Sequence, residues 1–123
     1  MNEAMNAAFS GARIRAMFAV IDARRWDELR GFLHRDVVYS RPGYALMQGI
    51  DAVLAFYAHE RVIASGTHVL HSVLVDGRHA AAFGRFLGTH RDGSALDEEF
   101  ADRYETDGAM IVRRQSYFHR PVI

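Results

Sequence analysis

The sequence predicts an α+β fold in which three helices precede a four-stranded antiparallel meander. Up to about residue 64, apolar residues recur at three- and four-residue steps, which is typical of amphipathic helices. From Thr67 onward the period changes to two, as in half-buried strands. Turn signals divide this second half at Asp76-Gly77, Arg91-Asp92-Gly93 and Asp107-Gly108.

The first two helices follow from their apolar stripes. The first is predicted from about residue 4 to Asp22 and ends near Ala23; its stripe consists of Ile14, Met17, Phe18 and Ile21. The second is the stretch RRWDELRGFL, residues 24–33, with charges on one side and Trp26, Leu29, Phe32 and Leu33 on the other.

A strand and a third helix complete the first half of the chain. The strand is predicted over 36–41 and stops at Arg41-Pro42-Gly43, because proline cannot donate to a β-ladder. The third helix is predicted from about residue 50 to 64. Asp51 in its first turn suits the helix dipole, and Gly66 is expected to close it.

Composition limits the classes of function. The 123 residues suit one domain, 1–123, and the 15 basic and 15 acidic residues cancel, so neither nucleic acid nor a membrane surface is an expected partner. There is no cysteine, and no histidines or acids stand at ligand spacing, so we expect no metal and no cofactor. The first residues contain no long apolar run, so we expect a cytoplasmic protein.

The residue pattern of the strand at 96–105 predicts which of its faces is buried. Its odd positions are charged and its even positions include Leu96, Phe100 and Tyr104, so the even face is buried. Asp102 shares that face and must be paired or neutralised there. Arg85 or Arg114 could pair with it, either as a structural ion pair or as part of a site.

The strand that begins near Thr67 carries His68 and His71 on opposite faces. His68 shares its face with Leu70, Ser72 and Leu74, which suits a pocket wall. His71 shares the more apolar face with Val69, Val73 and Val75, which suits packing against a second copy, so we predict a homodimer. The alternative for His68 is a satisfied core histidine.

On the third helix, Tyr57 and Arg61 lie on one stripe and could supply a phenol and a cation to the pocket. The alternative is that Tyr57 packs by its edge while Arg61 lies in solvent.

The order of these elements resembles the nuclear-transport-factor-like superfamily, in particular its SnoaL-like branch of polyketide cyclases, ketosteroid isomerases and dehydratases. Three stretches carry the resemblance: IDARRWDELRGFLHRDVVYSRPG, QGIDAVLAFYAHERVIASGTHVLHSVLVDG and FADRYETDGAMIVRRQSYF. The resemblance implies a single SnoaL-like domain with a cone-shaped, curved mixed or antiparallel sheet wrapped around the N-terminal helices. It also implies an internal apolar pocket and dimerisation through the outer sheet face.

The chain departs from two branches of this family. Aligned with the ketosteroid isomerases, it has Arg41 in place of the general-base carboxylate, Met17 in place of the oxyanion-hole phenol and Phe100 in place of the second acid. The acid that limonene-epoxide hydrolases hold before an aromatic pair is Ser116 here.

The scytalone dehydratases give a closer partial match. Their catalytic aspartate falls on Asp22, and their first catalytic histidine, in a Thr-x-His setting, is similar in place to His68. Their second histidine corresponds to Gly88, or to His90 if the loop is shifted, and one of their water-holding tyrosines falls on Arg41.

We therefore expect a cofactor-independent proton-transfer enzyme, a cyclase, isomerase or dehydratase, acting on a small apolar carbonyl-bearing metabolite such as a polyketide. His68 would be the acid–base group, Asp22 or Asp102 would orient it, and Arg41 or Tyr57 would stabilise an enolate. The expected substrate contacts are Arg41, Tyr57, Arg61, Phe100, Tyr104, Arg114 and Phe118. The alternative is a non-catalytic small-molecule-binding or dimerisation domain, because this fold hosts several functions.

Overall fold

The computed structural model describes residues 9–120. Its helices are α2 (Gly11–Asp22), α3 (Trp26–Leu29) and α4 (Ile50–Ala55), and α4 continues as a π-helical turn, η1 (Phe56–Glu60). Its strands are β1 (Leu33–Ser40), β2 (Met47–Gln48), β3 (Ile63–Asp76), β4 (His79–His90), β5 (Ala95–Thr106) and β6 (Ile111–Phe118). Within this part of the chain, no helix has both the length and the apolar character needed to cross a membrane.

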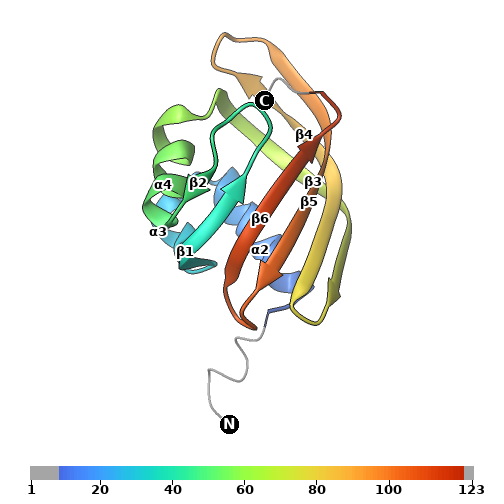
Figure 1. The fold of residues 1–123 in the computed structure, drawn as a ribbon. Coiled ribbons are helices and arrows are strands. Elements are labelled where there is room, and N and C mark those ends of the chain that lie inside the picture. Colours follow the sequence, from blue (N-terminus) through green and yellow to red (C-terminus); the bar gives the residue numbers. More distant parts are fainter. Residues whose placement is uncertain (1–8, 121–123) are drawn as a thin grey trace.

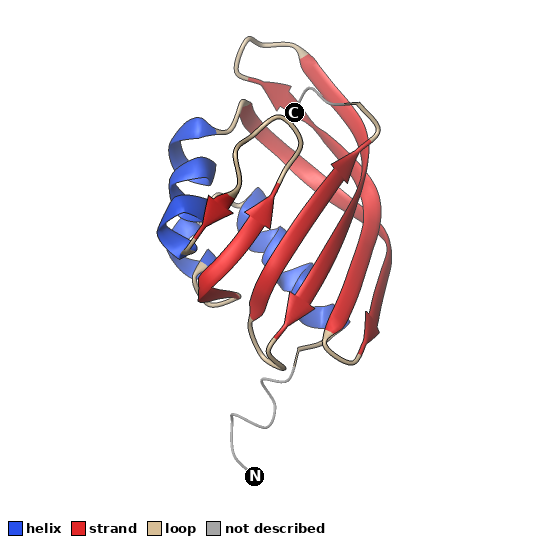
Figure 2. Cartoon of the chain, in the orientation of Figure 1, coloured by secondary structure: helices blue, strands red, loops and turns tan. Residues whose placement is uncertain are grey.

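The six strands form one mixed sheet in the order β2-β1-β6-β5-β4-β3 (Figures 1 and 2). The strands β3 to β6 are the predicted antiparallel meander, and β1 lies parallel to β6. Helix α2 lies across one face of this curved sheet, and α3 and α4 lie beyond β1 (Figure 1). The predicted α+β cone fold is therefore confirmed.

The core lies between α2 and the inner face of the sheet. The predicted stripe of α2 is fully buried: Ile14, Met17, Phe18 and Ile21 are each at most 2% exposed. The even positions of β5 and the even positions of β4 face this core, as the period of two requires. The cavity described below opens in the same layer.

The first two helices are shorter than predicted. Residues 4–8 of the first prediction lie outside the described residues, and α2 begins at Gly11 after Ser10. The second prediction, 24–33, is wrong at both ends. Arg24 has a positive φ of 59°, which breaks the helix before Trp26, and Leu33 already pairs with Ile111 in the sheet.

The third helix also ends early. The Arg61 N–H donates to the Phe56 carbonyl at 2.8 Å, which closes the π-helical turn, and Ile63 then pairs with His90 in β3. Gly66 does not close a helix, contrary to the prediction. It lies in β3, where a Cβ would stand 2.1 Å from the Phe86 ring.

A bulge in β3 changes which residues face inward. His68 and Leu70 are partly buried on the inner face and His71 is exposed on the outer face, as predicted. The register then shifts between Leu70 and Ser72. Beyond this shift the prediction is wrong: Ser72 and Leu74 are exposed, Leu74 at 61%, while Val73 packs against the core.

Candidate active site

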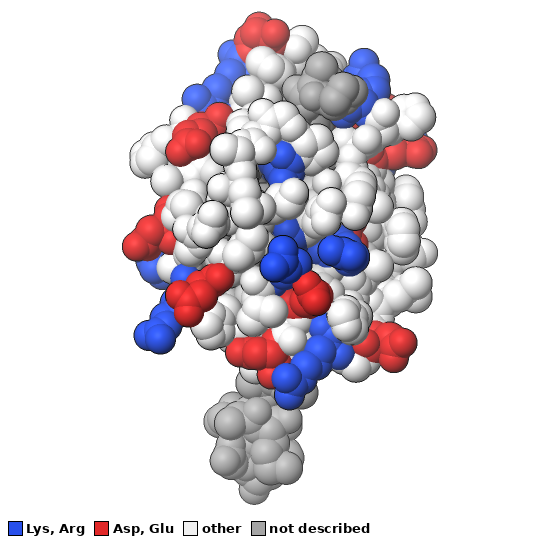
Figure 3. Space-filling view, in the orientation of Figure 1, with Lys and Arg blue, Asp and Glu red and all other residues white. Residues whose placement is uncertain are grey.

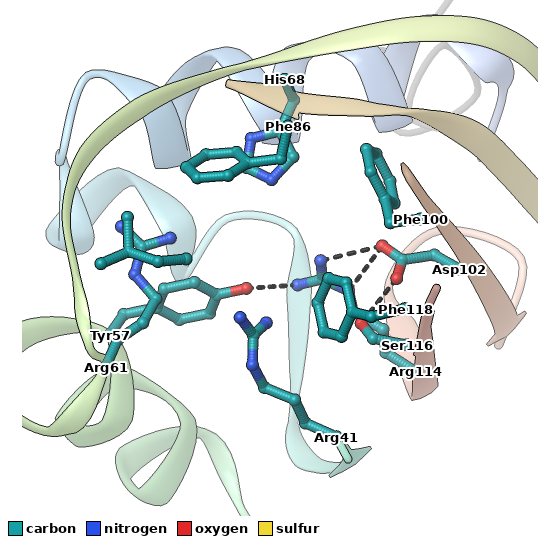
Figure 4. A pocket seen from close by; sticks show the side chains of 11 residues that line it. Arg41, Tyr57, Arg61, His68, Phe86, Phe100, Asp102, Arg114, Ser116 and Phe118 are labelled. Atoms are coloured by element: carbon teal, nitrogen blue, oxygen red, sulfur yellow. Dashed lines mark hydrogen bonds and ion pairs between the residues drawn. The ribbon is translucent and has the colours of Figure 1, made fainter. Parts of the chain in front are cut away.

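A small cavity lies between the inner face of the sheet and the turn η1 (Figure 4). Its free volume is about 10 Å³, which is room for one water molecule. One side of its lining is aromatic and the other is rich in arginine. The lining residues are Arg41, Tyr57, Arg61, Ile63, His68, Phe86, Phe100, Asp102, Arg114, Ser116 and Phe118.

His68 is held by the carboxylate of Asp22, which stands at the end of α2. Asp22 Oδ1 is 2.5 Å from His68 Nδ1, and Asp22 Oδ2 accepts the backbone N–H of His68 at 2.8 Å. A carboxylate can only accept here, so Nδ1 carries the hydrogen and Nε2 of the neutral ring keeps its lone pair. The pair therefore fixes both the position and the tautomer of the imidazole.

Three phenylalanine rings surround this imidazole. The ring centroids of Phe18, Phe86 and Phe100 lie 4.6, 4.7 and 5.3 Å from that of His68. Burial among them lowers the pKa of His68 below its usual value, although Asp22 acts in the opposite direction. His68 is thus a neutral base that is already oriented.

A second polar cluster is built on Asp102. Asp102 Oδ2 accepts from Arg114 Nε at 3.1 Å and Nη2 at 2.8 Å, and from the Tyr104 hydroxyl at 2.7 Å. Ser116 donates to Oδ1 at 2.6 Å. All four side chains are buried, and Asp102 is 2% exposed. Every oxygen of this inward carboxylate is satisfied, and its partner is Arg114 rather than Arg85.

Arg114 also reaches Tyr57 from the other side. Its Nη1 donates to the Tyr57 hydroxyl at 2.6 Å. Burial raises the pKa of Tyr57 to about 12, so the phenol keeps its proton at neutral pH. Because the hydroxyl accepts from Arg114, its own hydrogen can point elsewhere, for example to an oxygen in the cavity.

Arg41 follows directly after β1 and approaches the same region (Figure 4). It is 6% exposed, its Nη1 donates to the Tyr39 hydroxyl at 2.9 Å, and its guanidinium lies 4.7 Å from the ring centroid of Phe118. The Tyr39 hydroxyl is also 2.7 Å from Ser116 Oγ. Burial favours a high pKa for Tyr39, but Arg114 and Arg41 outweigh it and lower that pKa.

Arg61 ends the π-helical turn and is 4% exposed. The alternative that placed it in solvent is therefore wrong. Its guanidinium lies 5.6 Å from the ring centroid of Trp26 and 5.1 Å from that of Tyr57. Burial lowers its pKa to about 10, which still leaves it charged at neutral pH.

The structure brings most of the predicted site residues together. His68, Asp102, Arg41, Tyr57, Arg61, Phe100, Arg114 and Phe118 line the cavity, and Asp22 reaches it through His68. Tyr104 does not line it, contrary to prediction, because its hydroxyl is turned to Asp102 behind the wall. Asp22, not Asp102, contacts His68.

Three lining residues, Phe86, Ser116 and Ile63, were not assigned to the site from the sequence. Tyr39, which lies behind the lining and contacts Arg41 and Ser116, was also missed. Phe86 pairs with His68 across β3 and β4, and Ser116 shares its face of β6 with Arg114. Strand parity could have found both. Ile63 gave no such signal, because it lay in the predicted third helix. Tyr39 gave none either, because the neighbours of the short strand predicted over 36–41 were unknown.

Within residues 9–120, no three or more His, Asp or Glu side chains are placed to hold a metal ion together. Both carboxylates of the site accept hydrogen bonds from neighbouring groups, Asp22 from His68 and Asp102 from Arg114, Tyr104 and Ser116.

Several solved structures share this fold. One from Burkholderia pseudomallei K96243, of unknown function, has a TM-score of 0.81 and 18% identity over 89% of this chain and 92% of its own. A candidate SnoaL-like polyketide cyclase from Jannaschia sp. CCS1 has a TM-score of 0.78 and 13% identity over 88% and 83%. TerC, co-crystallised with polyporic acid, has a TM-score of 0.78 and 19% identity over 87% and 88%.

The family is defined by a sequence match. A family model described as a SnoaL-like domain matches residues 14–114. The chain belongs to this family, as the resemblance implied. None of the curated proteins compared with the chain matches it.

Proposed function

We propose that this protein is a cofactor-independent enzyme that transfers a proton within a small apolar carbonyl-bearing metabolite, as a cyclase, isomerase or dehydratase does. The single observation that carries the proposal is the Asp22–His68 pair, 2.5 Å apart, at the wall of a buried cavity. A core histidine that only needed a hydrogen-bond partner would not require a second, cationic cluster opposite it.

The reaction begins with His68. Nε2 takes a proton from the carbon next to the substrate carbonyl, and the electron pair of that C–H bond moves into an enolate. Asp22 stabilises the imidazolium that forms. The enolate oxygen accepts the hydrogen of the Tyr57 hydroxyl, which Arg114 polarises from behind at 2.6 Å.

The proton then leaves His68 at a second position. If it goes to another carbon of the substrate, the reaction is an isomerisation. If it goes to a departing hydroxyl, water leaves and the reaction is a dehydration. If it goes to an alkoxide formed when the enolate attacks a second carbonyl, the reaction is a ring closure. In each case His68 ends neutral again and no oxidant or reductant is consumed. Phe86 and Phe100 exclude bulk water, which keeps the enolate from random protonation.

The substrate class is supported by neighbours of the same fold. A candidate polyketide cyclase and a protein co-crystallised with polyporic acid share it. Since the cavity holds only about 10 Å³ of free space, a metabolite enters when wall side chains move. Phe118 at the end of β6 is partly exposed and is the aromatic wall residue best placed to do so.

A probe reaction can test the proposal before the substrate is known. The protein should accelerate deuterium exchange at the carbon next to the carbonyl of 2-tetralone in D₂O, followed by NMR. His68→Gln should lower that rate by about 10²–10⁴-fold, the usual contribution of a positioned acid–base group. The matched control is His71→Gln, an exposed histidine on the same strand, which should keep the rate of the wild type.

A second candidate is a non-catalytic small-molecule-binding domain, and the small closed cavity favours it. In that case carbonyl ligands would raise the melting temperature of wild type and His68→Gln alike, while neither accelerated exchange. Exchange at equal rates in wild type and His68→Gln would contradict the role of His68.

A further inference from the structure

Arg61 is a buried cation with no carboxylate partner in the described part of the chain. It is 4% exposed, and its Nε is buried without a hydrogen-bond acceptor among residues 9–120. The two carboxylates nearest the cavity are already committed, Asp102 to Arg114 and Asp22 to His68. A buried charge in this condition is costly unless a ligand completes it.

Aromatic rings and other cations surround Arg61. Trp26 and Tyr57 lie against the guanidinium at 5.6 and 5.1 Å, within the range of cation–π contacts. The other charged groups that act on it most strongly, Arg41 and Arg24, are cations and repel it. Rings can satisfy the positive charge in part, but they cannot accept the N–H groups at the edge of the plane.

Arg61 also lines the cavity that contains His68. An arginine offers parallel N–H groups in one plane, which match the two oxygens of a carboxylate. The apolar part of the same cavity lining consists of Ile63, Phe86, Phe100 and Phe118. A ligand that pairs with the guanidinium and also packs against these apolar side chains has a carboxylate at one end and a flat unsaturated body.

We propose that Arg61 is the anion-binding residue of the cavity and that the ligand is a small aromatic or conjugated carboxylic acid. The inference rests on the proposed function in taking this ligand to be the substrate. The carboxylate lies on Arg61, and the body of the ligand extends along the phenylalanine wall toward His68 (Figure 4). This narrows the metabolite from any apolar carbonyl compound to one that carries an acid group.

Binding of acids and their neutral amides tests the subsite without any turnover. The probes are benzoate and trans-cinnamate against benzamide and cinnamamide, titrated by calorimetry. At least one acid should bind the wild type about 10- to 100-fold more tightly than its amide, the range for a charge-assisted bidentate contact. Arg61→Gln should remove this preference.

Arg13→Gln is the matched control. The Arg13 guanidinium also lies over an aromatic ring, 4.2 Å from the centroid of Phe32, and its Nε is likewise buried without an acceptor. Arg13 does not line the cavity, so this variant should keep the preference for acids. Should Arg61→Gln fail to fold, the Arg61 Nε–H resonance of the wild type should shift on adding benzoate or cinnamate but not the amides.

The outcomes separate this proposal from the preceding one. Amides that bind as well as the acids, acids that do not bind, or a preference that survives in Arg61→Gln would overturn the carboxylate subsite. The proposed enzyme function would still be supported in that case if deuterium exchange depends on His68. Conversely, an acid preference that depends on Arg61, without exchange that depends on His68, would support the subsite and contradict the enzyme.

Discussion

Burial and hydrogen bonding act in opposite directions on His68. Three phenylalanine rings disfavour the imidazolium, while Asp22 favours it, and burial is the larger effect. The pKa of His68 is therefore lower in the folded chain than in the unfolded chain, where it is about 6.5. As the pH falls below that value, the unfolded chain takes up the proton first.

This difference predicts a loss of stability in mild acid. The contribution of His68 is fully present above the unfolded pKa and is lost as the pH falls from about 6.5 toward the folded pKa. Urea unfolding at about pH 7.5 and about pH 5.5 should show a smaller drop for His68→Gln than for the wild type. His71→Gln should behave as the wild type; an equal drop in all three proteins would refute the shifted pKa.

Asp102 allows a second prediction at this scale. Asp102→Ala leaves the buried guanidinium of Arg114 without its carboxylate, which should cost about 3–5 kcal/mol of unfolding free energy. Asp97→Ala is the control. Asp97 pairs with Arg85, and the two residues are twelve positions apart, as Asp102 and Arg114 are, but this pair lies on the exposed face. The melting temperature of Asp97→Ala should hardly change; equal effects of the two variants would show that burial does not decide the energy of the pair.

Among the elements, β3 is shaped by close contact with glycines of β4. A Cβ on Gly84 would lie 2.3 Å from the Val69 carbonyl oxygen and 3.2 Å from Leu70 Cα, beside the register shift of β3. Backbone atoms there cannot move aside without breaking the ladder. The bulge of β3 thus requires a residue without a Cβ at position 84.

Gly84→Ala should consequently destabilise the protein by at least about 1–3 kcal/mol, as overpacking does. The control Gly11→Ala places a Cβ 3.4 Å from Val73 Cγ1, an ordinary contact at the start of α2, and should be neutral or slightly stabilising. Urea denaturation measures both. A Gly84→Ala protein as stable as the wild type would mean that the two strands can separate at this point.

The same bulge explains where sequence reasoning succeeds and where it fails. Alternation alone placed His68 and Asp102 inside, because these positions lie in regular ladders. It also placed His71 outside, at the point where the register shifts. It failed for Leu74, since one inserted residue reverses every later side chain and leaves no mark in the sequence. The end of the third helix was predicted wrongly for a related reason: it depends on the pairing of Ile63 with β4, which is a tertiary contact.

At the scale of the molecule, the helices described within residues 9–120 cover one face of the sheet (Figure 1). Helix α2 packs on the inner face, and the outer face is open in Figure 3, where uncharged atoms occupy much of the centre. Phe83 and Tyr117 flank Ala101 across three neighbouring strands of this face, and both rings are more than 40% exposed. Val69 and Leu87 extend this apolar surface on β3 and β4.

An open apolar sheet face of this kind predicts a homodimer, because water contact with such a patch is unfavourable. Stable dimers dissociate only at concentrations well below about 10 μM. Light scattering at about 10 μM should therefore give twice the chain mass of 13.9 kDa. Phe83→Arg should give the single mass, since it places a charge at the centre of the contact. Leu46 lies in the segment between β1 and β2 and is more exposed than Phe83, so Leu46→Arg should leave the dimer intact. A monomeric wild type, or a dimer that survives Phe83→Arg, would show that this face is not the contact between the copies.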